Sequence, residues 1–231
     1  MADALDSKSS GSNTVWVQLP PPASLKKRVV VGGAILLLLA AGLGGVAWNA
    51  WLKDRLIPKR WGVVEAGAIY RSARLPPALL KKMVGQYRIR RIVDLTLADP
   101  TDAGQQTEKT VAAELGVEYL NYPLYGSGVG EIGSYAQAVA VMVAAKQAGR
   151  PVLVHCAAGT QRTGGVVAAY RMLIEKRPPA EAYAELIRYG WNPKKNRILP
   201  DFLNEHMREL AERLLEMRLI DAFPDPLPVL E

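Results

Sequence analysis

The sequence predicts an α/β protein with a short, mostly parallel central sheet flanked by helices and preceded by a single transmembrane helix. Beyond residue 60, apolar runs of strand length alternate with longer segments of helical periodicity, which is typical of parallel strands joined by crossover helices. Before residue 60 stands one uncharged apolar run of 24 residues. With 49% hydrophobic residues among 231, the chain has enough apolar material for one domain and an appendage.

The N-terminal part divides by composition into a tail, an apolar run and a linker. Residues 1–28 are rich in Ser, Asp, Gly, Asn and Pro, which predicts a disordered tail. Residues 29–52 form the apolar run; at 1.5 Å per residue it would extend about 36 Å, enough to cross a hydrocarbon core of about 30 Å. We expect a transmembrane anchor there, followed by a basic linker at 53–60. The leader is too long for a cleaved signal peptide, and a buried core helix of this length usually has a polar face.

The predicted localisation is therefore a single-pass membrane protein. Lysines and arginines flank both ends of the apolar run in nearly equal number, so the charge pattern assigns no side to the following domain. The formal net charge of +7 favours anionic lipid or phosphorylated substrates as partners. The sequence has neither zinc-finger spacing nor an RNA-recognition motif, which argues against nucleic acid.

The globular domain is expected at 61–220, with a Pro-rich C-terminal tail at 221–231. Four segments of apolar or β-branched residues predict strands, at 67–73, 89–96, 117–124 and 151–155. Six longer segments with helical spacing predict helices, at 76–87, 102–116, 132–149, 163–176, 179–190 and 199–220. Strands and helices alternate through the first four helices, which is the order of a parallel sheet.

The only cysteine lies in "VLVHCAAGTQRTGG", residues 152–165, between a strand expected to end at His155 and the helix behind it. A strand-loop-helix unit directs backbone N–H groups and a helix N-terminus at one point, which suits an anion. Arg162 adds a planar fork for two phosphate oxygens. Such surroundings favour the thiolate of Cys156 over its thiol. A lone free cysteine is otherwise most often an inert packing residue.

The decapeptide "HCAAGTQRTG" resembles the signature loop His-Cys-x5-Arg-Ser/Thr of cysteine-dependent protein tyrosine and dual-specificity phosphatases. The upstream segments "VVEAGAIYRSARLPPALL", "YRIRRIVDL" and "LGVEYLNYPL" are similar in kind and order to the bacterial dual-specificity-like branch, and the resemblance covers residues 61–190. It implies a dual-specificity phosphatase-like fold and a phosphoric monoester hydrolase. Its substrate would be a phosphorylated protein, above all phosphotyrosine, and its intermediate would be phosphocysteine.

The resemblance also implies a role for each residue of the loop. Cys156 would attack phosphorus, Arg162 would hold the equatorial oxygens, Thr163 would assist departure of the thiolate, and His155 would tune the cysteine. Backbone amides would complete the phosphate cradle, from Ala157, Ala158, Gly159, Thr160, Gln161 and Arg162. The resemblance implies no metal and no cofactor.

The general acid departs from the family pattern. The family usually carries an aspartate on an upstream loop, or, in a related bacterial branch, just before the arginine. Here the second position is Gln161, and the upstream loop "YPLYGSGVGEIGSY" has Glu131 as its only acid. Glutamate is chemically competent, so Glu131 is the provisional acid, although it equally suits the start of the following helix. Asp99 and Asp102 are fallback candidates, and Asp102 also reads as a helix N-cap.

Two other function classes stay open. A catalytically weak, phosphatase-like module would bind phosphorylated ligands without turnover, because protonation of the leaving group would be poor. A phospholipid-headgroup phosphatase would agree with the basic charge, but signature loops of that type tend to carry lysines. Arg71 is expected to form a structural ion pair, and His206 to have no catalytic part.

Overall fold

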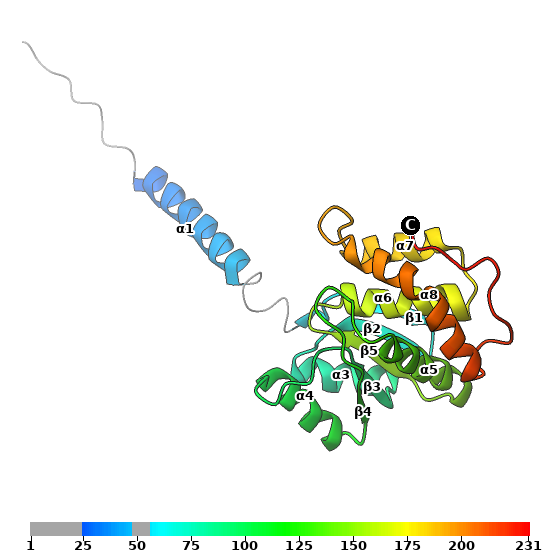
Figure 1. The fold of residues 1–231 in the computed structure, drawn as a ribbon. Coiled ribbons are helices and arrows are strands. Elements are labelled where there is room, and N and C mark those ends of the chain that lie inside the picture. The colour runs from blue at the N-terminus through cyan, green and yellow to red at the C-terminus, as the bar shows by residue number, and fades with distance from the viewer. Residues whose placement is uncertain (1–24, 48–55) are drawn as a thin grey trace, which may run out of the picture. The chain divides into compact units, whose positions relative to one another are not determined.

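The computed structural model describes residues 25–47 and 56–231, which belong to two compact units, Met1–Trp48 and Asn49–Glu231. The described residues of the first unit form the helix α1 (Leu25–Ala47), which takes in the end of the predicted tail (Figure 1). Predictions for residues 1–24 and 48–55, including the end of the apolar run and the start of the basic linker, lie outside the described residues.

The predicted transmembrane helix and single-pass membrane localisation are wrong. Across the described residues, no helix combines the length and the apolar character that crossing a bilayer requires. The prediction had taken an apolar run up to Leu52, whereas the described helix stops at Ala47 and starts at Leu25, among the basic residues that precede the run.

The second unit is built on a five-stranded sheet with the order β1-β2-β5-β3-β4. The strands are β1 (Gly62–Glu65), β2 (Ile69–Ala73), β3 (Arg91–Asp94), β4 (Glu118–Asn121) and β5 (Val152–Cys156). Every pairing is parallel except β1 with β2, so the sheet is mixed but mostly parallel, as predicted. The short edge strand β1 was not predicted, because a strand of four residues is too short to show a clear alternation of apolar and polar residues.

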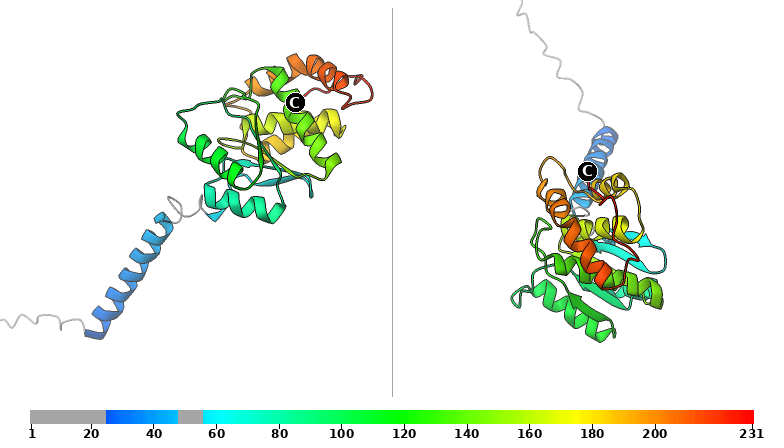
Figure 2. Two further views of the ribbon diagram at one scale, coloured as in Figure 1. Left: turned by 90° about the horizontal axis from the view of Figure 1, so that it is seen from below. Right: turned by 45° about the vertical axis from the view of Figure 1, so that its right-hand side comes forward.

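Helices cover both faces of this sheet (Figures 1 and 2). Their bounds are α3 (Pro77–Tyr87), α4 (Ala103–Glu114), α5 (Ile132–Ala148), α6 (Gln161–Ala169), α7 (Pro179–Arg188) and α8 (Ile198–Glu216). One further segment, Tyr170–Ile174, continues α6 as a π-helix, so the single helix expected at 163–176 has two parts. Local signals set several ends: Asp102 caps α4 by accepting from the Gln105 amide at 3.0 Å, and Gly149 ends α5 with φ +60°.

Side-chain alternation along the strands separates two cores. Ile92 and Leu153 pack with α3 and α4, whereas Val93, Val152 and Val154 pack with the helices of the other face. Because consecutive strand residues point to opposite faces, His155 projects toward α3 and α4 and Cys156 toward the other helices. The buried strand β5 lies between the parallel strands β2 and β3, so the loop after Cys156 emerges at the carboxyl edge of the sheet, where α/β proteins bind ligands.

The C-terminal segment 221–231 is irregular but packs back on the domain. The side chain of Asn204 in α8 makes two hydrogen bonds with the backbone of Leu230. It donates to the Leu230 carbonyl at 3.2 Å and accepts from the Leu230 amide at 2.7 Å. Leu230 is buried in the larger core. The predicted Pro-rich tail is therefore part of the folded unit.

Candidate active site

The signature loop, Cys156 to Arg162, starts at the last residue of β5 and runs into the first turn of α6. This helix begins at Gln161, two residues earlier than predicted. Gly159 has φ +71°, and a Cβ atom at this position would lie 2.5 Å from the Ala73 amide nitrogen. Only glycine fits, because the backbone is left-handed and β2 lies directly against it. The turn brings the Gly159 N–H to 3.2 Å from the Cys156 sulfur, which accepts its hydrogen bond.

The Cys156 side chain is almost fully buried, with 1% of its surface exposed. Burial alone raises the pKa of the thiol, since it penalises the charged form. The hydroxyl and amide of Thr163, the charge of Arg162 and the Gly159 amide together outweigh burial and lower the pKa below its ordinary value. The sulfur therefore lies in a donor-rich, cationic environment, which distinguishes a reactive cysteine from a packing cysteine.

Arg162 keeps an unused donor at this loop. Its Nε atom is buried and has no hydrogen-bond partner within residues 25–47 and 56–231. A buried guanidinium N–H without a partner is costly unless an anion completes it. Together with the N-terminal amides of α6, this donor makes the loop fit a phosphate group.

Arg71 supports the loop from the β2 side. Its side chain is fully buried; Nη2 donates to the Gly159 carbonyl at 3.1 Å and Nη1 lies 3.5 Å from Glu185 Oε1. The guanidinium also stacks 3.8 Å above the Tyr189 ring. Burial lowers the pKa of Arg71 to about 10, which leaves it charged at neutral pH. The predicted ion pair of Arg71 is confirmed, and it fixes the peptide next to the nucleophile.

Gln161, at the edge of the site, links the signature loop to the loop that contains Gly126 and to the segment that contains Asn196. In the amide orientation that satisfies both ends, its nitrogen donates to the carbonyls of Gly126 at 2.7 Å and Ser127 at 3.0 Å, and its oxygen accepts from Asn196 at 3.1 Å. Gly126 and Ser127 belong to the loop that leads to Glu131. The position where the related bacterial branch carries an acid is thus a cross-link between loops here. The sequence alone did not indicate this, because the partners are 35 residues apart on each side.

His155 enters a buried group of charges on the other face of the sheet. Its Nε2 atom lies 3.1 Å from Glu108 Oε1, an ion pair without the alignment of a regular hydrogen bond. Burial would lower the pKa of His155, but the charges of Glu108 and then Asp94 raise it to about 9. Asp94, Glu108 and His155 have ligand atoms within 4.8 Å of one another, as a metal site would. Arg74 lies 3.8 Å from Asp94 and 3.7 Å from Glu108, so cations of the protein already occupy the space around both carboxylates.

A model of the family described as "Dual specificity phosphatase, catalytic domain" matches residues 77–213, which is more than half of the chain. The chain belongs to the dual specificity phosphatase family. It is thus a cysteine-based phosphatase that hydrolyses phosphoesters. The matched region contains the whole signature loop, so the resemblance that the loop carried in the sequence is confirmed.

Solved structures of other phosphatases share the fold. P. aeruginosa TpbA is 21% identical with a TM-score of 0.52, over 66% of this chain and 87% of that one. The catalytic domain of the PP-IP phosphatase SIW14 from S. cerevisiae is 16% identical with a TM-score of 0.53, over 74% and 97%. The phosphatase Tk-PTP in a mutant form is 20% identical with a TM-score of 0.53, over 68% and 97%. No curated protein matches the chain significantly.

The candidate acids of this dual specificity phosphatase differ in their surroundings. Glu131 is exposed at the N-cap of α5, where a negative charge favours the helix start, and its side chain makes no capping hydrogen bond. Hydrogen bonds from Thr101 lower the pKa of Asp99, and a hydrogen bond from Arg74 lowers that of Asp102. Both fallback carboxyls are held in their charged form, which is the wrong form for a general acid.

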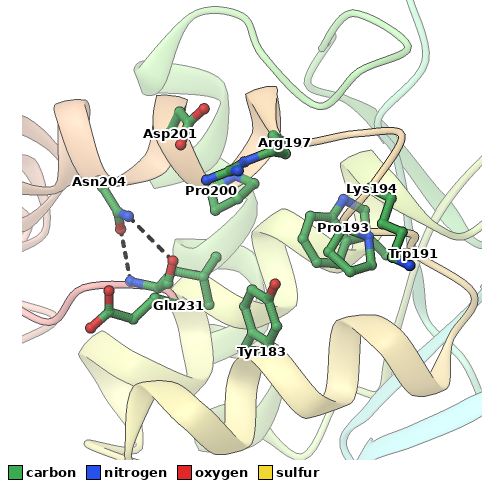
Figure 3. A pocket seen from close by; sticks show the side chains of 10 residues that line it. Tyr183, Trp191, Pro193, Lys194, Arg197, Pro200, Asp201, Asn204 and Glu231 are labelled. Atoms are coloured by element: carbon green, nitrogen blue, oxygen red, sulfur yellow. Dashed lines mark hydrogen bonds between the residues drawn. The ribbon is translucent and has the colours of Figure 1, made fainter.

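A surface pocket of about 610 Å³ lies away from the signature loop (Figure 3). Residues of α7, α8, the 191–197 segment and the C-terminus line it, among them Tyr183, Lys194 and Arg197, and no signature residue does. It is therefore not the phosphate cradle. His206 of α8 contacts Phe202, one turn earlier in the same helix, through the Phe202 carbonyl at 2.9 Å and the Phe202 ring.

Proposed function

We propose that this protein hydrolyses phosphotyrosine in proteins through a phosphocysteine intermediate, with dual specificity as the wider form of the same activity. The observation that carries the proposal is a buried sulfur held among amide donors beside an arginine with an unused N–H. Residues 61–220 would form the catalytic domain, with which the family match at 77–213 agrees.

The proposed reaction has two steps. The Cys156 thiolate attacks phosphorus opposite the leaving oxygen. A sulfur–phosphorus bond forms as the bond between phosphorus and the substrate oxygen breaks. Arg162 and the amides of residues 157–162 bind the equatorial oxygens, which carry more charge in the transition state. Water then attacks the phosphocysteine, the Thr163 hydroxyl stabilises the departing thiolate, and inorganic phosphate is released.

Glu131 is the proposed general acid. In the first step it would give its proton to the leaving oxygen, and in the second step the carboxylate would take a proton from the attacking water. Its loop is linked to the signature loop through Gln161, which supports an approach of the two segments. The lowered pKa values of Asp99 and Asp102 argue against those two carboxyls as the acid.

Phosphotyrosine is favoured by the walls of the site. Ala157 and Ala158 are exposed and uncharged, so the loop offers no lysine to a polyphosphorylated headgroup. Tyr125, at the start of the loop that Gln161 holds, is 59% exposed and provides an aromatic surface for a phenyl ring. One structure of P. aeruginosa TpbA is a complex with pTyr, a ligand of that protein.

The experiment is phosphate release from a phosphotyrosine peptide between pH 5 and 8 by the wild type, Cys156→Ser and Glu131→Gln. We expect Cys156→Ser to fall to the background rate while still binding vanadate, and Glu131→Gln to lose about 100-fold or more in kcat. For a substrate with a very acidic leaving group the Glu131→Gln loss should almost vanish, because that group needs no proton.

Wild-type turnover by Cys156→Ser would contradict the mechanism. Vanadate binding without turnover in all three proteins would instead favour a phosphate-binding module. Activity confined to phosphoinositides or inositol pyrophosphates would overturn the choice of substrate but not the chemistry.

A further inference from the structure

Glu108 is a buried carboxylate that the loop chemistry does not use. Its side chain is 2% exposed. It belongs to α4, which covers the face of the sheet opposite to the one that Cys156 faces. Neither carboxylate oxygen makes a regular hydrogen bond to a described residue. Its close contacts there are ionic, to His155 Nε2 at 3.1 Å and to Arg74 Nε at 3.7 Å.

The neighbouring carboxylate, Asp94, is bound quite differently. It accepts hydrogen bonds from the Thr96 amide at 2.9 Å, the Gln105 side chain at 2.9 Å and the Tyr119 hydroxyl at 2.6 Å. Those donors satisfy Asp94 whatever the charge of His155 is. Glu108 lacks such donors, and Arg74 is shared with Asp102 at 2.6 Å. The shortest ionic contact of the Glu108 carboxylate within the described residues is therefore with His155, and an unpaired buried carboxylate is strongly disfavoured.

We propose that Glu108 is a positioning residue that holds His155 as an imidazolium behind Cys156, and that this fixed positive charge keeps the nucleophile ionised at neutral pH. The two residues are consecutive in β5 and point to opposite faces, so the imidazolium acts through space on the sulfur rather than by proton transfer. The inference deepens the proposed function, because it rests on Cys156 being the nucleophile.

The other charged and titratable groups around the pair are consistent with this assignment. On the His155 side they are Asp94 of β3, Arg74 after β2 and Tyr119 of β4, and the raised pKa of His155, about 9, reflects Glu108 first among the carboxylates. On the Cys156 side they are Arg162 of α6, buried Arg71 of β2 and Tyr135 of α5. Glu108 acts only on the first side, so its removal changes one cation and leaves the cradle intact.

The test uses the composition of the chain, which has one cysteine and two histidines. The rate of Cys156 alkylation by iodoacetamide, measured from pH 4 to 9 in the full chain, reports thiolate formation without any turnover. In Glu108→Gln we expect the midpoint to move up by about one pH unit, so that alkylation below the midpoint is about tenfold slower. The acid limb of kcat/KM should move by the same amount.

Two matched variants separate charge from structure. Tyr119→Phe removes a partly buried hydrogen bond to Asp94 without removing a charge, and should leave the midpoint unchanged. Glu108→Asp keeps the charge and should restore most of the wild-type midpoint. An unmoved midpoint in a folded Glu108→Gln protein would overturn the proposal.

A second measurement keeps the proposal testable if Glu108→Gln does not fold. In wild-type protein labelled at histidine, nuclear magnetic resonance resolves His155 from His206, and the proposal requires His155 to be an imidazolium at pH 7. A neutral His155 at that pH would overturn it. If alkylation and histidine titration behave as expected while no phosphoester is hydrolysed, the proposed function fails and the Glu108 assignment stands.

Discussion

Two groups of charged side chains support the same loop, one on each face of the sheet. They differ in the number of permanent positive charges relative to carboxylates. On the α3 and α4 face, the group contains Arg74, Asp94, Glu108 and His155. On the other face, the group contains Arg71, Arg171, Glu175 and Glu185. The first has Arg74 as its only permanent cation against two carboxylates. The second has two buried arginines for two carboxylates, and the exposed Arg177 lies a further 2.6 Å from Glu175.

The difference indicates two tasks. In the second group Arg171 binds Glu185 at 2.9 Å and Glu175 at 2.7 Å, and Arg71 completes the set with the Gly159 carbonyl. That group is neutral and fixes backbone shape. The first group is short of positive charge until His155 is protonated, so it sets the charge state of a residue next to the nucleophile. Buried ion pairs add little net stability on average, and a role in specifying a site explains their presence better.

The largest expected effect comes from breaking the neutral group. Arg71→Met should lower the free energy of unfolding by about 3–5 kcal/mol, because it leaves Glu185 short of a partner and the Gly159 carbonyl without its donor. Urea denaturation measures this loss. Vanadate affinity should fall in the same variant at a temperature where it is still folded. A loss below about 1 kcal/mol with intact vanadate binding would mean that Arg71 does not shape the loop.

The second effect is a pH dependence of the free energy of unfolding, which comes from the group that contains His155 and Glu108. The pKa of His155 is raised to about 9 from an ordinary 6.5, so its contribution to stability is complete below pH 6.5 and is lost as pH rises through 9. The shift corresponds to about 3 kcal/mol at most. The unfolding free energy should be followed in a Cys156→Ser background, which removes the opposing titration of the thiol. Adding His155→Asn should flatten the decline; an equally steep decline would locate the titration elsewhere.

A smaller effect concerns the rim. Gln161→Ala should lower kcat/KM for a phosphotyrosine peptide by about tenfold, because the loop leading to Glu131 loses its two carbonyl contacts. The loss should be greatest for substrates whose leaving groups need a proton. Asn196→Ala, which frees the other end of the same amide, should reproduce a part of it. Equal losses for all leaving groups would show that Gln161 acts on the cradle rather than on the acid loop.

The sequence predicted the loop well because the signature is local. Cys156, Arg162 and Thr163 are within eight residues, and the strand and helix on either side have clear periodicity. The edge strand β1 escaped prediction since it is four residues long and pairs antiparallel only with β2. The apolar N-terminal run gave a membrane prediction that the described helix does not bear out.

Contacts between segments that are far apart in the chain could not be predicted from the sequence. Arg71 and Glu185 are 114 residues apart, and nothing local marked Glu108 as the partner of His155. Its helix reads as an ordinary surface helix, in which Glu108 is one of three charged residues beside Lys109 and Glu114. For Arg71 a structural ion pair was the default expectation, and the structure shows it with Glu185.

The most direct test of the account is to trap the intermediate. The wild-type protein, mixed with a phosphotyrosine peptide and quenched in acid within milliseconds, should carry phosphorus on Cys156 as mapped by mass spectrometry of the peptide spanning residues 151–162. The adduct should accumulate when water attack is slowed by Glu131→Gln with an activated substrate, and be absent from Cys156→Ser. Turnover without any protein-bound phosphorus, or phosphorus on another residue, would contradict nucleophilic catalysis by Cys156.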